Sequence, residues 1–552
     1  MKKWQVENNG RIESIKEIVK ILLANRGINS KKETEDFLNP DLSLISTDSV
    51  GISKVQIKKA VRRIEAAIKR KERIIVYGDY DVDGICASSI LWETLDLLKA
   101  DAMPFIPSRF EEGYGLSKEG LDTLIKSQKP NLIITVDNGI VANEAVDYAN
   151  KNGIDVIVTD HHLPSKNLPR ALSIVHTTKL CGAGVAYMLA KEILKQKIKR
   201  DDNHLELVAL ATIADLVPLT GANRIFVYFG LINLRKTKRI GFTALIQKAG
   251  IQKDNIGVYE IGHILAPRLN AMGRLASAMD SLRLICTKDK KRAIALAELL
   301  SKTNFERQQI TINAFSHAKD KIGRSKIKNL IFIADEGYQQ GIVGLVAGRL
   351  VEEYYFPSIV ISKGEKYSKA SARSVKGFNI VEFLRTASDL LVDVGGHPMA
   401  AGFTVETAKL DLLEKKLFES SQKLLKKEHL ERVLRVDCEL DLSFVNYETY
   451  IEIQKLAPFG MANPEPTFLT KNLIIESIRF VGQDKKHIKI EFKNQNSDFR
   501  ISGIYFNGVV HQDLTEGEKV SIVYAMSLNE WNGNKRVELK IKDLNLLGKA
   551  LS

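Results

Sequence analysis

The feature that most constrains the fold of this chain is a regular alternation of patterns between Ile74 and Leu219. Short runs rich in β-branched residues, such as IIVYG, NLIITVD and IDVIVTD, are separated by segments with the helical spacing of apolar residues. Such alternation predicts βαβ units, in which helices cover a mainly parallel sheet. Ligands of an open parallel sheet bind in the crevice at the carboxyl ends of its strands. The residues that follow each predicted strand are therefore candidates for a functional site.

Acidic side chains follow the first of these strands at every second position. The stretch GDYDVDG contains Asp79, Asp81 and Asp83. In an extended backbone alternate side chains point to the same side, so three carboxylates would share it. Carboxylates that lie so close together raise one another's pKa and destabilise the fold unless a cation lies among them.

The next two predicted strands also end in groups that bind metals. Asp137 ends NLIITVD, the triplet Asp160, His161 and His162 ends IDVIVTDHH, and Asp215 lies on or just beyond a helix in LVALATIADLVPL. Carboxylates and imidazoles suit Mn²⁺ or a similar divalent ion, and Mg²⁺ where oxygen dominates, whereas structural zinc usually takes sulfur ligands. Because this set exceeds the needs of one ion, we expect two ions bridged by a carboxylate, for which Asp137 is the candidate.

Each of these motifs also has a simpler structural interpretation. Alternating aspartates are common in turns, paired histidines are more often surface or core residues, and an aspartate after a strand often caps the next helix. Three successive strands that all end in metal-binding groups favour the metal site.

The rest of the chain divides into segments of different pattern. With 552 residues the chain is too long for one core. We expect an N-terminal helical segment (1–50), an α/β domain with a mainly parallel sheet (51–224), a long helical connector (225–325), a second α/β domain (326–430) and an antiparallel β-barrel (431–552). The barrel is predicted by strands such as HIKIEF and FRISGIYF, in which apolar and polar residues alternate.

Composition narrows the class of protein. The formal net charge of +14 is a reason to consider nucleic acid, because Lys and Arg neutralise phosphates, although solubility alone also accounts for a basic surface. The four scattered cysteines argue against a zinc site or a disulfide framework and predict a reducing compartment, the cytoplasm. No run of 18 apolar residues and no secretory signal occurs, so we expect no membrane partner.

In their order along the chain, GDYDVDG, VDNG, TDHH and ADLVPL resemble the four motifs of the DHH phosphoesterase superfamily. The downstream segments PRLNAMGRL, GIVGLVAGRLVEEYYFP, ASARSVKGFNI and GGHPMAAGF resemble the RecJ exonuclease family and its DHHA1 substrate-binding domain. The segment LAPFGMANPEPTF and the strands after it resemble the OB-fold domain of that family. The resemblance covers nearly everything from about residue 50 to residue 550.

The resemblance implies a 5′→3′ exonuclease that degrades single-stranded DNA to 5′-mononucleotides in recombination and repair. It implies two ions, Mn²⁺ or Mg²⁺, held by Asp79, Asp81, Asp83, Asp137, His161 and Asp215. Asp137 and His162 would be catalytic, and His162 would contact the scissile phosphate or assist proton transfer. A helicase and a single-strand-binding protein are candidate partners that the chain itself does not reveal.

Basic and glycine-rich motifs are expected to hold the DNA strand, since guanidinium groups match phosphates in two-point geometry and glycine lets a backbone approach a ligand. The candidates are Arg109, Arg268, Asn270, Arg274, Arg373, Gly396 and His397. The alternatives are interdomain salt bridges for the arginines, a local cap for Asn270 and a structural role for His397. In the barrel, Tyr505, Phe506 and Trp531 are candidates for base stacking, although barrel aromatics are more often core residues.

Four positions depart from the RecJ pattern. Tyr338 and Gln339 stand where Trp-His is frequent, His176 where Asn-Pro is common, and Pro398 where alanine is frequent. These departures concern the strand groove and the pocket for the strand end, and they leave the metal site intact.

Three other functions are consistent with only part of the sequence. A phosphodiesterase for short oligonucleotides or cyclic dinucleotides would use the same metal site, but it needs neither a long connector nor an added β-domain. A catalytically inactive DNA-binding scaffold should have lost the acidic ligands, which this chain retains. A nucleotide-powered motor is disfavoured because no GxxxxGK[ST] loop occurs.

Overall fold

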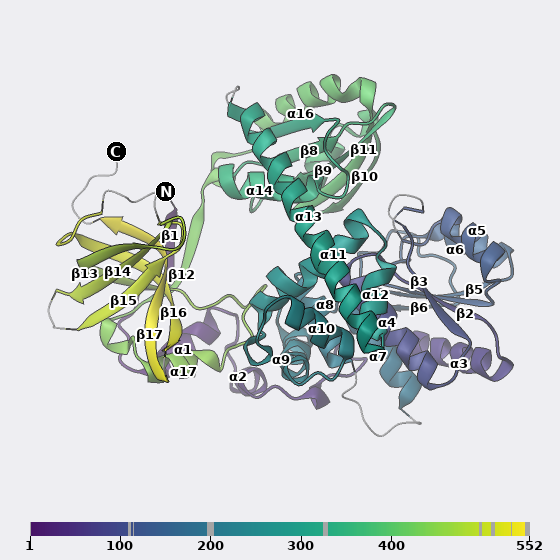
Figure 1. The fold of residues 1–552 in the computed structure, drawn as a ribbon, viewed down its shortest axis with the longest axis horizontal. Helices are drawn as coiled ribbons and strands as arrows, with labels where there is room; N and C mark the ends of the chain where they lie inside the picture. Colours follow the sequence, from purple (N-terminus) through teal and green to yellow (C-terminus); the bar gives the residue numbers. More distant parts are fainter. Residues whose placement is uncertain are drawn as a thin grey trace. The chain divides into compact units, whose positions relative to one another are not determined.

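The computed structural model describes residues 2–108, 112–113, 115–195, 204–323, 329–495, 499–508, 514–531 and 533–546. The chain forms two compact units (Figure 1). The larger unit contains residues 46–215 and 229–431, and the smaller contains residues 1–45, 216–228 and 432–552. Among the described residues, every helix is too short or too polar to span a lipid bilayer.

Five parallel strands form the first sheet of the larger unit, in the order β3-β2-β4-β5-β6. They are β2 (Ile74–Tyr77), β3 (Ala102–Phe105), β4 (Leu132–Val136), β5 (Asp155–Asp160) and β6 (Ser173–His176). The prediction of a parallel sheet is confirmed. The strand order reverses between β2 and β4, so the crevice of this sheet lies where these two strands end.

Helices cover both faces of this sheet (Figure 1), which is why β2 and β4 are buried at every position. The helices are α3 (Lys54–Arg70), α4 (Val82–Leu97), α5 (Lys118–Ser127), α6 (Asn143–Lys151), α7 (Gly182–Leu194) and α8 (Leu205–Ala214). Helices α5 and α6 contribute apolar side chains to the core on one face, and α4 and α7 pack together on the other.

The predicted helical connector is confirmed. It contains α9 (Gly221–Arg235), α10 (Ile240–Lys248), a π-helical turn η3 (Glu260–Leu265), α11 (Ala266–Leu275), α12 (Met279–Cys286) and the 34-residue α13 (Lys290–Gly323). Its first eight residues, 221–228, belong to the smaller unit. Helix α13 packs against α10, α11 and α12 and leads into the second α/β domain.

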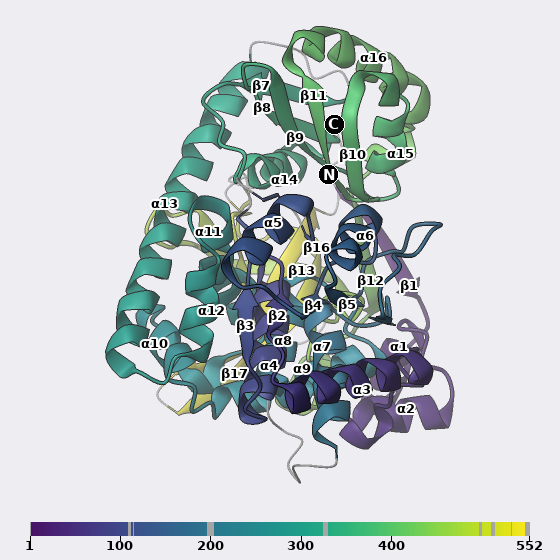
Figure 2. The ribbon, with the colours of Figure 1, turned by 90° about the vertical axis from the view of Figure 1, so that its right-hand side faces the viewer.

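The second α/β domain has a mixed sheet in the order β10-β11-β9-β8-β7 (Figure 2). Strands β7 and β8 are parallel and the others antiparallel. The strands are β7 (Ile331–Asp335), β8 (Ser358–Ser362), β9 (Tyr367–Arg373), β10 (Leu391–His397) and β11 (Ala400–Glu406). The helices are α14 (Val343–Tyr354), α15 (Ile380–Arg385) and α16 (Leu410–Leu424).

The smaller unit contains a seven-stranded sheet in the order β1-β12-β13-β14-β15-β17-β16. Pairing of β13 with β16 closes five of these strands into the predicted barrel. The strands are β1 (Lys3–Asn8), β12 (Val433–Glu439), β13 (Phe468–Val481), β14 (His487–Asn494), β15 (Arg500–Tyr505), β16 (Lys519–Trp531) and β17 (Asn534–Leu546). The helices are α1 (Ile15–Ala24), α2 (Lys31–Leu38) and α17 (Tyr447–Gln454).

Strand β1 was not indicated by the sequence, which predicted only helices at the N-terminus. It pairs in parallel with β12, so the first and last parts of the chain share one sheet. Short 3₁₀ turns complete the fold at η1 (Leu42–Leu44), η2 (Lys253–Asn255), η4 (Ser388–Leu390), η5 (Thr407–Lys409), η6 (Lys427–Leu430) and η7 (Leu442–Phe444).

Candidate metal centre

The six predicted metal ligands meet at the carboxyl ends of β2, β4 and β5. Atoms of Asp79, Asp81 and Asp137 that could bind a metal lie within 4.8 Å of one another. Atoms of Asp83, His161 and Asp215 form a second group of the same size, and His162 lies within the same distance of Asp137 and His161. The sheet therefore brings together groups from positions 79 to 215, as the strand pattern predicted.

The three aspartates of GDYDVDG do not share an extended strand, which corrects the first expectation. Helix α4 begins at Val82, and Asp81 caps it by accepting a hydrogen bond from the N–H of Gly84 at 3.1 Å. Asp83 is already helical and points elsewhere. Both of its carboxylate oxygens accept hydrogen bonds of 2.6 Å, from the N–H groups of Gly182 and Ala183 at the start of α7. The positive end of that helix stabilises the carboxylate.

The start of α7 lies against Asp137 because residue 182 has no side chain. A Cβ on Gly182 would lie 2.5 Å from Oδ1 of Asp137, which no side chain tolerates. The sequence alone did not point to this glycine, although the run of small residues CGAG is the signal that could have done so.

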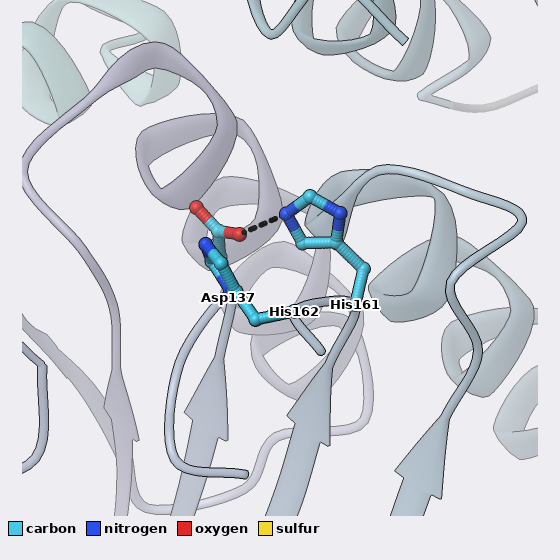
Figure 3. A group of neighbouring side chains, drawn as sticks. All are labelled: Asp137, His161 and His162. Atoms are coloured by element: carbon cyan, nitrogen blue, oxygen red, sulfur yellow. Dashed lines mark ion pairs between the residues drawn. The ribbon is translucent and has the colours of Figure 1, made fainter. Parts of the chain in front are cut away.

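Asp137 and His161 form the centre of the cluster (Figure 3). Nε2 of His161 lies 3.1 Å from Oδ1 of Asp137, 3.6 Å from Oδ2 of Asp83 and 3.8 Å from Oδ2 of Asp215. Oδ1 of Asp137 is buried and makes no hydrogen bond. A buried carboxylate oxygen without a partner is costly, and a divalent cation supplies that partner. The residues present thus fit the metal ions that the sequence predicts.

The electrostatics of the cluster also favour a cation. Burial and then the charge of Asp83 raise the pKa of Asp137 well above its usual value. Burial, followed by the charges of Asp83 and Asp81, raises the pKa of Asp215 to about 8. Burial lowers the pKa of His161, so its imidazole is neutral and free to ligate a metal. The carboxylates repel one another in a way that divalent ions would relieve.

Asp160 holds His162 in place and belongs to neither group of ligands. Its carboxylate accepts hydrogen bonds from the N–H groups of Ile140, His161 and His162 at 2.9, 2.7 and 3.2 Å, and its Oδ1 lies 2.8 Å from Nδ1 of His162. Burial lowers the pKa of His162, but the hydrogen bond and the charge of Asp160 outweigh burial and raise it to about 9. This raised pKa favours the protonated form of the His162 ring at neutral pH. The sequence named Asp160 only as part of its triplet and predicted no such role.

Comparison with known proteins agrees with this geometry. Residues 73–212 match the N-terminal domain of the DHH family, residues 326–423 the DHHA1 domain and residues 436–543 the RecJ OB domain. Over 98% of its length the chain is 35% identical to the single-stranded-DNA-specific exonuclease RecJ of Bacillus subtilis, of which it covers 70%. The chain belongs to the RecJ family.

Solved RecJ structures have the same fold. The crystal structure of RecJ from Thermus thermophilus in complex with Mn²⁺ matches 100% of this chain and 80% of its own, with a TM-score of 0.83 and 29% identity. The complex with Mg²⁺ from the same organism matches 99% of this chain and 79% of its own, with a TM-score of 0.78 and 26% identity. The resemblance read from the motifs is confirmed, and so is the predicted fold class.

Two of the predicted strand-binding arginines lack a carboxylate partner. Nη1 of Arg373 donates to Oγ of Ser371 and to the carbonyl of Ala372, both at 2.9 Å, and Nη1 of Arg268 donates to the carbonyl of Ile264 at 2.7 Å. Burial lowers the pKa of both groups. Among the described residues neither arginine makes a salt bridge, so that alternative fails for them. Arg109 lies outside the described residues.

Helix α11 joins the aspartate loop to the second α/β domain. Oδ1 of Asn270 accepts a hydrogen bond of 2.9 Å from the N–H of Val82, at the start of α4. At the other side, Nη1 of Arg274 donates to the carbonyl of Gly341 at 3.0 Å. Asn270 thus helps Asp81 to cap the start of a distant helix, which is not the local cap of the alternative interpretation, and its contact with substrate stays a prediction.

His397 lies over the metal centre. It is exposed at the end of β10, with its ring centre 6.4 Å from that of His162. Gly396 has a φ of +139°, and a Cβ there would lie 2.3 Å from the carbonyl oxygen of Ala400. Glycine at this position is therefore required by the β10–β11 hairpin itself.

The positions that depart from the RecJ pattern are accommodated locally. Tyr338 is buried, with its hydroxyl 3.1 Å from Nδ1 of His317, while Gln339 is exposed. Nε2 of His176 lies 2.7 Å from the carbonyl oxygen of His162, and the carbonyl of Pro398 accepts a hydrogen bond of 2.9 Å from Ile380. His176 therefore helps to brace the histidine pair.

The aromatic residues of the barrel differ in exposure. Tyr505 is only 9% exposed and belongs to the core, so its predicted role in base stacking is not supported. Phe506 is 51% exposed beside the ring of His487 and keeps that candidate role. The side chain of Trp531 lies outside the described part of the chain.

Proposed function

We propose that this chain is a metal-dependent 5′→3′ exonuclease that degrades single-stranded DNA to 5′-mononucleotides during recombination and repair. The observation that carries the proposal is the cluster of possible metal ligands around Asp137, whose buried Oδ1 has no hydrogen-bond partner. The Bacillus subtilis relative is a single-stranded-DNA-specific exonuclease, and the Thermus thermophilus relative binds Mn²⁺ and Mg²⁺.

The two ligand groups are the proposed sites of two ions, Mn²⁺ or Mg²⁺. Asp79 and Asp81 would hold one ion, the group Asp83, His161 and Asp215 the other, and Asp137 lies where it can serve both. The chemistry that such ions supply is Lewis-acid catalysis, which makes water acidic near neutral pH and neutralises charge on a phosphate.

The chain's own residues then act on the phosphodiester. His162 is protonated at neutral pH and held by Asp160, so it can contact the scissile phosphate or give a proton to the departing 3′ oxygen. Arg373 and Arg268, which have no carboxylate partner among the described residues, are the proposed phosphate contacts. His397, whose ring centre lies 6.4 Å from that of His162, is the proposed contact for the strand end.

The division of labour along the chain follows the three matched domains. We propose that the DHH domain (51–224) cleaves the phosphodiester bond. The DHHA1 domain (326–430), which follows the connector (225–325), is proposed to bind the end of the strand. The OB domain (431–552) is proposed to bind the rest of the single strand. A helicase and a single-strand-binding protein are proposed to supply that strand. We place the protein in the cytoplasm, because its four cysteines are unpaired, as in reducing compartments.

A long single-stranded DNA labelled separately at each end tests the proposal. With Mn²⁺, we expect wild type to release mononucleotides from the 5′ end and Asp137→Ala to release none. Asp96→Ala, which changes an exposed aspartate on α4, is the matched control and should cut like wild type.

Three results would contradict parts of this proposal. Release from the 3′ end would refute the polarity alone. Hydrolysis of dinucleotides without digestion of long strands would favour the small-substrate phosphodiesterase. Binding without cutting under every divalent ion would favour the inactive scaffold.

A further inference from the structure

Strand β7 forms the open edge of the second sheet (Figure 2). The N–H of Ile331 donates to the carbonyl of Pro357 at 2.9 Å, and the N–H of Lys363 donates to the carbonyl of Asp335 at 3.0 Å. In a parallel ladder these bonds turn every second residue of β7 toward β8. The peptide groups of Phe332 and Ala334 therefore face away from the sheet.

The outward peptide groups of β7 are almost without partners. Among the described residues, only the carbonyl of Ala334 has one, Nζ of Lys321 at 3.1 Å. An edge strand of this kind is a template for pairing with another chain, and proteins usually protect such edges with a charge, a proline or a bulge.

A groove of about 760 Å³ runs along this edge. Its floor is β7, one wall is α16, and the other wall is the end of α13 with Lys321 and Ile322. The volume falls within the range of about 300–1,000 Å³ that ligand sites occupy. The five residues of β7 span roughly 17 Å, which is the length over which an added strand could pair with it.

The two walls differ in charge. The α16 wall carries Asp411, Glu414 and Glu419, and among the described residues none of them makes a salt bridge. On the other side, Lys321 pairs with Asp335 at 2.5 Å and Lys363 with Glu336 at 3.1 Å, so their charges are already neutralised. Lys415 offsets one carboxylate of the wall.

The α16 wall carries more negative than positive charge, whereas the whole chain has a formal net charge of +14. Burial and the neighbouring Asp411 also raise the pKa of Glu414, as expected where negative charge is not neutralised. Such a wall repels the phosphates of DNA and attracts cationic side chains. The groove is therefore unsuited to the proposed substrate.

We propose that this groove docks an extended segment of a partner protein, in which lysine or arginine alternates with apolar residues, and that the segment adds a strand to β7. Side chains of an added strand point alternately to the two faces of the sheet. Those that point to α16 meet the carboxylates, and those that point to α13 meet Ile322. Backbone hydrogen bonds to Phe332 and Ala334 provide affinity, and the carboxylates provide the preference for basic residues.

Binding of a defined peptide tests this proposal. The probe is a fluorescein-labelled ten-residue peptide of alternating valine and lysine with blocked ends, and its anisotropy is followed as full-length protein is added. A second peptide has glutamate in place of lysine, and a third is N-methylated at every second residue. We expect both to bind at least about tenfold more weakly than the probe, because one loses the charge match and the other the backbone donors.

Two variants and one control locate the binding. Ala334→Pro removes an outward N–H and is tolerated on an edge strand, and the double variant Glu414→Lys, Glu419→Lys reverses the wall. Each variant should bind the probe peptide about fivefold to tenfold more weakly than wild type, while thermal unfolding and circular dichroism stay as in wild type. Glu365→Lys reverses the charge of one exposed carboxylate outside the groove and should bind like wild type.

Several outcomes would overturn the proposal. No binding of the probe up to millimolar protein would do so, as would equal binding of the glutamate or the N-methylated peptide. Equal binding by the variants would place the peptide elsewhere. A wild-type dimer in sedimentation that Ala334→Pro dissociates would show that a second copy of this chain occupies the edge.

Discussion

Asp137 illustrates at the scale of single residues how a functional group is kept in an unfavourable place. Its backbone has a φ of +63°, a region that aspartate tolerates better than most residues, and its N–H donates to the carbonyl of Thr159 at 3.0 Å. Its Oδ1 is buried without a hydrogen-bond partner and lies among other carboxylates. The fold thus bears a local cost that is relieved when a cation binds.

Asp137→Asn is expected to stabilise the metal-free protein and to abolish its response to metal. The amide avoids the cost of burying a carboxyl group that must carry a charge or take up a proton, which should raise the free energy of unfolding in a chelator by about 1 kcal/mol. Wild type at a Mn²⁺ concentration of about 100 Kd should gain roughly 2.7 kcal/mol, and the variant should gain little. Thermal unfolding with chelator and with Mn²⁺ measures both effects. Equal gains from Mn²⁺ would refute the role of Asp137.

Helix α11 shows at the scale of elements how distant parts of the site are held in register. Asn270 caps α4, and a Cβ on Gly273 would lie 2.3 Å from the carbonyl oxygen of Tyr80. On its other side α11 contacts Gly341 through Arg274. The helix is therefore positioned to keep the aspartate loop and the second α/β domain aligned.

Asn270→Ala tests this positioning. It leaves the N–H of Val82 without its acceptor, at a cost of about 1–2 kcal/mol, and should loosen the loop that carries Asp79 and Asp81. We expect Mn²⁺ to bind about tenfold more weakly, as measured by titration with detection of free Mn²⁺ by electron paramagnetic resonance. Asn255→Ala, in an exposed turn, is the control and should bind as wild type. If Asn270→Ala binds Mn²⁺ as tightly as wild type, Asn270 does not position the metal ligands.

A charged network ties α4 to the starts of α8 and α10. Oε1 and Oε2 of Glu93 accept hydrogen bonds from Arg239 at 2.7 and 2.8 Å, and Oε2 lies 2.8 Å from Nε2 of His204. Burial opposes ionisation of Glu93, but hydrogen bonds to His204 and Arg239 outweigh it and lower its pKa from 4.5 to about 2. Ionised Glu93 therefore stabilises the folded state.

This network predicts a pH dependence of stability. Because the pKa of Glu93 is depressed on folding, its contribution is complete above about pH 4.5 and is lost as the pH falls toward 2. Glu93→Gln should lower the free energy of unfolding by about 2–3 kcal/mol at pH 7, and the difference from wild type should shrink between pH 4.5 and pH 2. Urea unfolding at several pH values measures it. Glu119→Gln, exposed on α5, should have little effect at any pH, and a pH-independent difference for Glu93→Gln would contradict the prediction.

At the scale of the whole molecule, residues near the start of the chain pair with residues near its end. Strand β1 lies beside β12, and Nε1 of Trp4 donates to Oδ2 of Asp543 at 2.8 Å. Trp4 and Val6 pack against a small cluster that contains Val436 and Val523. The barrel unit is thus completed only when the first residues of the chain are present.

Trp4→Ala is expected to destabilise the barrel unit and to leave the metal centre unchanged. Loss of the partly buried indole and its hydrogen bond should cost about 2–3 kcal/mol within that unit. Calorimetry should show a lower transition for the barrel unit, while Mn²⁺ binding stays as in wild type. Gln5→Ala, on the exposed side of β1, should change neither. An equal shift of both unfolding transitions would contradict this prediction.

The sequence by itself determined the chemistry and the class of fold. Residues that follow apolar strands mark the crevice of a parallel sheet, because strand ends meet at one edge whatever the details of packing. That is why Asp79, Asp137 and His161 could be predicted to converge although they lie far apart along the chain. The long helix α13 and the barrel strands could also be predicted from the sequence, since each depends on local periodicity.

Only the tertiary structure decided how those residues are arranged and supported. The turn of Asp83 toward α7, the role of Asp160 behind His162 and the capping of α4 by Asn270 all depend on contacts that the tertiary fold creates. The same is true of β1, whose six residues become a strand because β12 offers them an edge to pair with. Local patterns record which face of an element is buried, and they do not record which distant group will meet it there.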